Sequence, residues 1–169
     1  MSTENLTQTE AIKKLKELSE KAGTCMFCTN LMTLPIAARP MSLRETDEEG
    51  NLWFLSSSDS NKNFEIADDN RVQLLFMNNS DYEYLSVFGK AFVYKDRAMI
   101  EEKWTKIANA WFEEGKDDPK VTVIRVTPDE TYYWDTKAGK LVSFVTFAAA
   151  ALTGIKTDNS DGVEGSLNI

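Results

Sequence analysis

A strand–turn–helix segment in the first half of the sequence has the composition of a phosphate-binding site. Residues 52–55 have strand character and run into a turn rich in hydroxyl groups, and Ser60 stands where a helix N-cap is expected. The free N–H groups of a helix N-terminus attract anions, and Lys62 in the first turn adds a full positive charge. Because lysine there opposes the helix dipole, its presence points to function. A serine-rich cap with a solvent-exposed lysine is the alternative, and this segment alone leaves it open.

A proline-containing strand carries the second candidate site. Residues 38–42 alternate like a strand, and Pro40 predicts a sheet edge or a bulge because proline cannot donate to a strand ladder. Backbone groups beside Pro40 would then be free to bind a ligand. Arg39, which shares a face with Met41, has the geometry to hold a phosphate or a polarised carbonyl through two parallel hydrogen bonds. A surface arginine on an edge strand is the alternative.

Aromatic residues form a third group. Trp104 and Trp111 lie seven residues apart on a predicted helix at 96–111 and are therefore expected to share a face. Trp134 ends a strand with two tyrosines before it. These side chains could stack on a flat ring, and packing in the core or at an interface is the alternative.

The residue inventory excludes several kinds of chemistry. The chain has no histidine, which excludes Ser-His-Asp and Cys-His catalysis, histidine-ligated zinc and histidine-ligated haem. Cys25 and Cys28 form a C-x-x-C, but in a regular strand this spacing puts the two thiols on opposite faces. We expect two buried strand cysteines. Asp117 and Asp118 precede a proline and predict a turn, so no metal site is expected.

The elements that must position these residues are mostly short strands joined by turns. An amphipathic helix is predicted at 9–22, ended by Gly23. One domain over residues 1–169 is expected, with a barrel at about 24–135, a C-terminal helix at about 140–153 and a tail at 155–169. Hairpin-connected strands with few helices between them indicate a small closed or partly closed barrel. The predicted strands are 25–30, 34–44, 51–56, 72–77, 82–94, 120–126 and 131–134, with a short helix at 61–69.

The charge of the chain restricts its partners. With 19 basic and 27 acidic residues, the formal net charge is −8. Such a surface repels nucleic acid and anionic lipid, so neither is expected as a partner, and an anionic ligand needs a local basic pocket. No apolar run reaches the roughly 18 residues of a membrane span. The first residues lack the features of a signal peptide, so a cytoplasmic location is expected.

Together these segments resemble the FMN-binding split-barrel family of the pyridoxamine-phosphate oxidases. The family has an R-x-V-L-L-K strand, an F-x-T-x-x-x-S-x-K strand–turn–helix, a V-x-G-x-A strand and a late F-W. The chain is most similar to the general stress protein 26-like branch, which has R-P-M, L-W-F-L, S-x-K and W-F-x-x-G-x-D-D-P. The matching residues here are 39–44, 52–62, 87–91, 111–119 and 133–134.

The resemblance implies a mainly β, α+β fold, a six-stranded antiparallel split β-barrel of Greek-key type with flanking helices. It also implies a homodimer with one FMN in each of two interfacial clefts, FAD being the alternative cofactor. By this likeness the phosphate would be held by Arg39, Ser60 and Lys62, with Ser56 and Asn61 nearby. The isoalloxazine would meet the backbone around Met41, Ser42, Phe54 and Leu55, and the partner subunit would close the site with Trp134 and Trp111.

Departures from the oxidases bear on the reaction. Those enzymes follow the late Trp with R-L-H-x-R, and here Val142 replaces the histidine and Phe144 the second arginine. Tyr84 stands where the oxidases have a glutamine that touches the flavin. Pyridoxamine-phosphate oxidase activity is therefore not expected.

Two functions remain after these departures, and no catalytic residue is assigned for either. The first is a flavin-dependent oxidoreductase acting on an unknown small molecule, since flavin supplies the redox chemistry. The second is a non-catalytic flavin-binding or flavin-sensing stress protein. A flavin-free interaction module and a haem-handling barrel are further alternatives.

Overall fold

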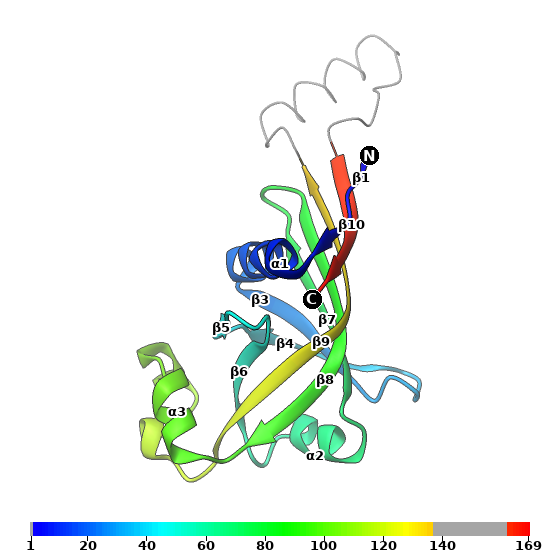
Figure 1. Ribbon diagram of the computed structural model, residues 1–169. Helices are drawn as coiled ribbons and strands as arrows, with labels where there is room; N and C mark the ends of the chain where they lie inside the picture. Colours follow the sequence, from blue (N-terminus) through cyan, green and yellow to red (C-terminus); the bar gives the residue numbers. More distant parts are fainter. Residues whose placement is uncertain (1, 137–161) are drawn as a thin grey trace.

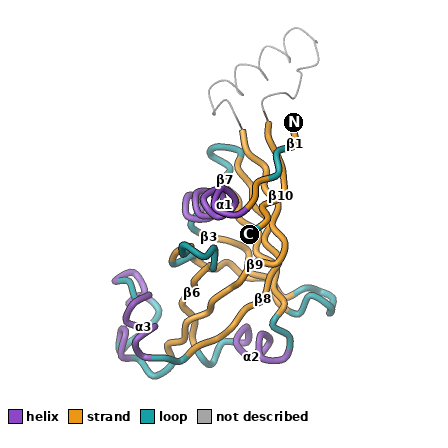
Figure 2. Tube along the Cα trace, in the orientation of Figure 1, coloured by secondary structure: helices purple, strands orange, loops and turns teal. Residues whose placement is uncertain are grey.

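A computed structural model describes residues 2–136 and 162–169 of the chain. In this part of the chain ten strands form one sheet, which curves around a core, and three α-helices and two short 3₁₀-helices lie against it (Figure 1). Figure 2 shows that strands make up most of the trace, with the helices at its periphery. The predicted mainly β, α+β fold is thereby confirmed.

The ten strands differ greatly in length. Two very short strands open the chain, and a long bent strand, β9, lies near its end. Their bounds are β1 Ser2–Thr3, β2 Leu6–Thr7, β3 Thr24–Thr29, β4 Ala37–Ser42, β5 Glu45–Thr46, β6 Leu52–Ser57, β7 Arg71–Asn78, β8 Glu83–Tyr94, β9 Val121–Thr136 and β10 Gly162–Asn168.

The sheet is curved but not closed. Its strands follow the order β1-β10-β9-β8-β7-β3-β4, and β6 pairs with the first half of β9. Among the described strands β4 pairs with β3 alone, so it is an edge strand, as Pro40 predicted. The expectation of six antiparallel strands is not confirmed, because β1 and β2 add parallel pairs to β10 and β5 adds a short pair to β6. The sequence signals of these short strands are too brief to recognise.

Helix α1, Gln8–Ala22, covers one end of the barrel. It begins one residue before the predicted position, and its N-cap is Thr7, whose side chain makes no capping hydrogen bond. Gly23 ends it with φ 68°, a left-handed conformation that costs glycine nothing. The buried face of α1 packs against the main core and comprises Ala11, Leu15 and Leu18.

Helix α2, Asn61–Asp68, covers the opposite end of the barrel, as Figure 1 shows. Its Ile66 is buried in the same core as the α1 residues. The two helices therefore cover the two ends of one apolar core. The inward-facing residues of the strands make up the rest of this core. None of the helices in the described part of the chain is both long and apolar enough to span a membrane.

The predicted helix at 96–111 is wrong in its second half. Helix α3 covers only Arg97–Lys103, and a 3₁₀-helix, η1, follows at Lys106–Ala110, with a second, η2, at Gly115–Asp117. Trp104 is extended at φ −66° and ψ 142°, which ends α3. The break lets Trp104 pack on Phe112, with ring centroids 5.7 Å apart, in a second apolar cluster on the outer face of β6 and β9.

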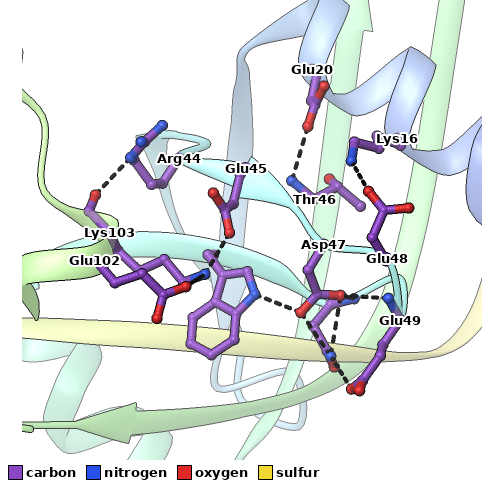
Figure 3. Close-up of polar contacts among 12 residues, drawn as sticks. Lys16, Glu20, Arg44, Glu45, Thr46, Asp47, Glu48, Glu49, Glu102 and Lys103 are labelled. Atoms are coloured by element: carbon purple, nitrogen blue, oxygen red, sulfur yellow. Dashed lines mark hydrogen bonds and ion pairs between the residues drawn. The ribbon is translucent and has the colours of Figure 1, made fainter. Parts of the chain in front are cut away.

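A polar cluster fixes the end of α3 to β5 and β6 (Figure 3). Lys103 Nζ donates to Glu45 Oε1 at 2.5 Å and to Glu102 Oε1 at 2.7 Å, and it lies 4.5 Å from the centroid of the Trp53 ring. Arg44 Nε donates to the Lys103 carbonyl at 2.6 Å, where α3 ends. Lys103 is only 6% exposed, so this cluster is part of the interior.

The C-terminal residues 155–169 are not all a tail. Gly162–Asn168 form β10, which pairs antiparallel with Thr136–Tyr132 of β9. Val163 and Leu167 alternate with polar residues and are buried in the main core, a period-two pattern that the Asp, Asn, Ser and Gly content hides. At Gly165 a Cβ atom would collide with the Glu4 carbonyl, so the close approach of the N-terminal segment requires glycine. The helix predicted at 140–153 lies outside the described residues.

Candidate functional site

Lys62 is the centre of a cluster of hydroxyl groups at the start of α2. Its Nζ donates to Ser60 Oγ at 2.6 Å and to Ser56 Oγ at 3.1 Å. Ser60 occupies the N-cap position of α2 with extended backbone, as predicted, but its side chain makes no capping bond within the helix. The hydroxyl instead accepts from Lys62. The lysine thus lies at the positive end of the helix, held by two neutral groups.

A buried hydrogen-bond chain holds this cluster in place. Ser56 Oγ donates to Asn63 Oδ1 at 2.9 Å, and Asn63 Nδ2 donates to Thr122 Oγ1 at 2.9 Å. Thr122 Oγ1 closes the chain by donating to the Ser56 carbonyl at 3.0 Å. These three residues are buried and come from β6, α2 and β9. The network therefore fixes the start of α2 against two strands.

Arg39 lies in the same region, within a ring of three side chains. Its NH1 donates to Thr29 Oγ1 at 2.5 Å and its NH2 donates to Glu65 Oε2 at 2.7 Å. Thr29 Oγ1 in turn donates to the same Glu65 oxygen. The ring joins β3, β4 and α2. Arg39 keeps further N–H donors beyond these two bonds, because a guanidinium carries five.

The electrostatics of the cluster favour an anion. Burial, and then the positive charge of Arg39, lower the pKa of Lys62 below its ordinary value. Burial works against ionisation of Glu65, but hydrogen bonds from Thr29 and Arg39 outweigh it and lower the pKa of this carboxyl. Two cations and one carboxylate leave an excess of one positive charge. An added anion would restore the stability of the charged form of Lys62.

The isoalloxazine candidates lie along the opening between β4 and β6. These strands are neighbours that do not pair, and they converge where the Arg44 amide donates to the Trp53 carbonyl at 2.7 Å. On that side β5 covers β6 only at Leu52 and Trp53. In the described part of the chain, the β6 edge from residue 54 onward and the facing edge of β4 therefore have no strand partner.

The predicted ring-binding side chains point in different directions. Met41 is half-buried against the main core, whereas Ser42 is exposed on the other face of β4. Phe54 is fully buried, with its ring 5.3 Å from that of Phe27, so its side chain cannot meet a ligand. Leu55 packs against the second cluster. Asn61 is exposed at the start of α2.

The two tryptophans of the prediction lie away from Lys62 within one chain. Trp111 is 68% exposed at the end of η1 and does not share a helix face with Trp104. Trp134 is half-buried on the outer face of β9, with its ring 4.9 Å from Tyr132, and it pairs with Tyr84 of β8. That end of β9 pairs with β10, at the opposite end of the barrel from α2 (Figure 1). The structure brings together Arg39, Ser56, Ser60 and Lys62 but neither tryptophan.

The remaining sequence candidates are the two cysteines, the acidic residues and the two positions that replace oxidase residues. Cys25 and Cys28 are both buried free thiols, and burial raises the pKa of each. Within residues 2–136 and 162–169, no group of three or more Cys, Asp or Glu side chains is arranged to hold a metal ion. Val142 and Phe144, which replace oxidase residues, lie outside the described residues.

Sequence reasoning missed four residues of the site: Thr29, Asn63, Glu65 and Thr122. Glu65 follows Lys62 by three residues on one helix, so this pair could have been found from spacing. Thr29 and Thr122 come from strands far away in the sequence. Their proximity depends on the pairing of β3 with β4 and of β6 with β9, which no local pattern reveals.

Solved structures with the same fold come from bacterial stress proteins. A Jannaschia sp. CCS1 protein provisionally assigned as general stress protein 26 aligns with a TM-score of 0.75 and 22% identity, over 96% of this chain and 100% of that one. The general stress protein 26 of Bacillus anthracis aligns with a TM-score of 0.63 and 20% identity, over 72% and 92%. A Xanthomonas citri protein described as a general stress FMN/FAD binding protein aligns with a TM-score of 0.63 and 26% identity, over 74% and 87%.

Sequence comparison leads to the same group. A curated relative, Protein bli-3 of Neurospora crassa, is 28% identical over 107 residues, which are 58% of this chain and 51% of that protein. The chain thus spans about half the length of this relative. Residues 10–158, most of the chain, match the family described as pyridoxamine 5'-phosphate oxidase like. The protein therefore belongs to the pyridoxamine 5'-phosphate oxidase like family.

Proposed function

We propose that this protein is an FMN-binding stress protein whose flavin phosphate binds at the cluster of Lys62, Arg39, Ser56 and Ser60. The observation that carries the proposal is the pair of cations, Lys62 in the first turn of α2 and Arg39 on β4, in a protein whose net charge is −8. A positive pocket that opposes the overall charge and lowers the pKa of its own lysine is unfavourable without an anionic ligand.

A phosphate monoester fits the donors that the cluster offers. Lys62 uses two of its three N–H bonds on serines, and Arg39 uses two of five on Thr29 and Glu65. The free donors and the backbone N–H groups of α2 together match the three oxygens of a phosphate. The Xanthomonas citri relative, described as FMN/FAD binding, supports a flavin as the rest of the ligand. FAD is the alternative, because it also carries phosphate.

The flavin ring is proposed to lie along the opening between β4 and β6. Alternate residues of a strand direct their N–H and C=O groups to opposite edges, so the unpaired backbone there belongs to Ser42 of β4 and Leu55 of β6. The backbone groups of Met41 and Phe54 face the paired strands β3 and β9. Backbone N–H and C=O groups of such an edge are suited to the hydrogen-bonding rim of an isoalloxazine. In this proposal the ring end of the site uses backbone groups, whereas the phosphate end uses side chains.

A second copy of the chain is proposed to cover the outer sheet face and to complete the site. The inward residues of β7 and β8 are buried, whereas on the outward face Met77 is 54% and Leu75 40% exposed, beside the hydrogen-bonded polar pair Gln73 and Ser86. Large apolar side chains gathered on one exposed face are typical of an interaction surface. In a homodimer this face would be buried, and Trp134 and Trp111 would reach the partner's flavin. The apolar and aromatic residues of this outward face are Met26, Leu75, Met77, Tyr84, Phe88, Tyr132 and Trp134.

The dimer is tested by placing a charged side chain at the centre of its proposed interface. Sedimentation of the wild-type chain should give twice the monomer mass, and Met77→Glu should give a monomer that remains folded. Met32→Glu, at an exposed apolar residue outside this sheet face, is the matched control and should remain a dimer. A wild-type monomer at micromolar concentration, or a dimeric Met77→Glu protein, would contradict the proposal.

For activity, we propose a flavin-dependent oxidoreductase acting on an unknown small molecule, with a non-catalytic flavin binder as the alternative. Bound flavin supplies hydride and electron transfer, so the lack of histidine is no obstacle. Tyr84 in place of the oxidase glutamine supports the absence of true pyridoxamine-phosphate oxidase activity. Anaerobic mixing with NADH or NADPH, followed by reoxidation with small acceptors, separates the two. Turnover supports an enzyme, whereas no reduction by either nicotinamide favours the binder.

Flavin binding itself is tested with the purified full chain. We expect FMN to be taken up with a shift of its visible absorbance and quenching of its fluorescence, one per protomer. Extraction and identification of the flavin that co-purifies distinguishes FMN from FAD. A protein that is colourless and fails to bind added FMN or FAD would contradict the proposal.

A further inference from the structure

We propose that Glu65 is a positioning residue for phosphate binding: its carboxylate holds Arg39 at the anion site although its charge repels the anion. The inference rests on the FMN phosphate site proposed above. It assigns a role to a residue that a simple count of charges would class as unfavourable there.

The geometry fixes Arg39 from two sides. One guanidinium nitrogen donates to Thr29 Oγ1 at 2.5 Å and the other donates to Glu65 Oε2 at 2.7 Å. Because Thr29 also donates to that same Glu65 oxygen, the three side chains form a closed ring across β3, β4 and α2. Thr29 is fully buried, so one corner of the ring cannot move. Arginine without such partners loses much rotamer freedom when it binds.

Glu65 makes its contacts to Arg39 and Thr29 rather than to Lys62. Lys62 Nζ bonds instead to Ser56 and Ser60. Burial is the main cause that lowers the pKa of Lys62, and the positive charge of Arg39 is the second. Glu65 acts on Lys62 only through space. The carboxylate therefore orients one cation and leaves the other with neutral partners, so that both keep donors for a phosphate.

The positioning role and the charge of Glu65 predict opposite changes in FMN affinity when Glu65 is removed. Replacing Glu65 by alanine removes a negative charge next to an anion site, and on Coulomb's law alone the affinity for FMN should rise. If Glu65 positions Arg39, the affinity should fall, because the guanidinium must then be ordered by the ligand. Riboflavin, which is FMN without its phosphate, should not sense the change.

The test measures Kd for FMN and for riboflavin with the full-length protein and its variants. We expect the wild type to prefer FMN, and Glu65→Ala to weaken FMN binding about tenfold while leaving riboflavin binding unchanged. Glu65→Gln, which keeps an acceptor for Arg39, should lose less. In an Arg39→Ala background, Glu65→Ala should cause no further loss, because the effect passes through Arg39.

Two further variants complete the comparison. Asp68→Ala removes the same charge from an exposed position on the same helix and should not weaken FMN binding. Thr29→Val, nearly isosteric, should weaken FMN binding about threefold, because it removes both hydrogen bonds of the Thr29 hydroxyl, the one from Arg39 and the one to Glu65.

The contradicting results are distinct. If the wild type prefers FMN but Glu65→Ala binds it as tightly or more tightly, the positioning role is wrong and the phosphate site stands. Equal losses for FMN and riboflavin would show a general structural role and would also overturn it. If the wild type binds FMN and riboflavin equally, the phosphate site itself is wrong, and this inference with it.

Discussion

Lys62 and Lys103 both lie at helix ends, yet their surroundings are opposite. Lys62 is in the first turn of α2, where the helix dipole is positive, and its direct partners are two serines. Lys103 is the last residue of α3, where the dipole is negative, and it lies between Glu45 and Glu102 over the Trp53 ring (Figure 3). The charge of Lys103 is therefore balanced by carboxylates and by the helix dipole, whereas the direct partners of Lys62 are neutral and the dipole opposes its charge.

The pKa shifts of the two lysines have opposite signs for this reason. Burial would lower the pKa of Lys103, but the hydrogen bonds that it donates to Glu102 and Glu45, with their negative charges, outweigh burial and raise that pKa. For Lys62, burial and the nearby Arg39 both lower the pKa. The difference teaches that burial alone does not mark a lysine as functional. A lysine whose charge the protein leaves unbalanced is the one that awaits a ligand.

Reversing the charge of Lys62 should have the largest effect. We expect Lys62→Glu to weaken FMN binding by about 100-fold or more, because it removes charge-assisted hydrogen bonds and adds repulsion. Thermal stability should change little. Lys120→Glu, an exposed charge reversal near the same turn, is the matched control and should bind FMN as the wild type does, in a fluorescence titration at physiological salt. Equal effects of the two substitutions would remove the distinction between a local site and general surface charge.

Replacing Lys103 should instead lower stability. Lys103→Met leaves Glu45 without its lysine partner beside the outer cluster, which should cost about 2 kcal/mol. The expected fall in Tm is about 4–8 °C for a chain of this size. FMN affinity should not change. Lys106→Met, an exposed lysine in η1, is the control in the same melting experiment. If Lys103→Met weakened FMN binding and left Tm unchanged, the assignment of the two lysines would be reversed.

Removing one hydroxyl from Lys62 should have a smaller effect. Ser60→Ala deletes an acceptor of the lysine at 2.6 Å, and about a fivefold loss in FMN affinity is expected. Stability should change little, because this hydroxyl makes no cap within α2. Ser57→Ala removes a hydroxyl that bonds to Asp59 instead, and isothermal titration should find its FMN affinity unchanged. A larger loss for Ser57→Ala than for Ser60→Ala would place the phosphate elsewhere on the turn.

The smallest of these effects at neutral pH is expected for the titration of Lys62, which should become visible in FMN binding only at alkaline pH. Lys62 binds phosphate in its charged form, and its pKa in the free protein lies below the ordinary 10.5. Bound phosphate favours the charged form, so affinity is full below the free-protein pKa and falls as pH rises through it. This alkaline decline should therefore begin earlier than for an ordinary lysine. Lys62→Arg, whose guanidinium stays charged, should abolish the decline in a titration series, and its persistence would assign the decline to another group.

The sequence predicted the local features of the phosphate site but not its long-range partners. Ser60 at the N-cap, Lys62 in the first turn and Pro40 on an edge strand follow from rules that involve neighbouring residues. Thr29 and Thr122 became part of the site only through strand pairing and the docking of α2, which depend on the whole fold. Glu65 is three residues from Lys62 in the sequence, but its hydrogen bonds with Arg39 and Thr29 also require that docking.

Errors in the predicted fold have a similar origin. The helix expected to reach Trp111 ends at Lys103, because Arg44 binds its last carbonyl and Trp104 turns toward Phe112. The expected tail contains β10, because two buried residues, Val163 and Leu167, suffice to fix a strand on β9. In both places a tertiary contact outweighed the local composition.

A crystal structure of the complex with FMN tests the central claim most directly. We predict that the phosphate lies within about 3.2 Å of Lys62 Nζ and of the Arg39 guanidinium, at the N-terminus of α2. Lys103 should keep its contacts with Glu45 and Glu102. A flavin phosphate bound elsewhere, with Lys62 still bonded only to Ser56 and Ser60, would contradict the account.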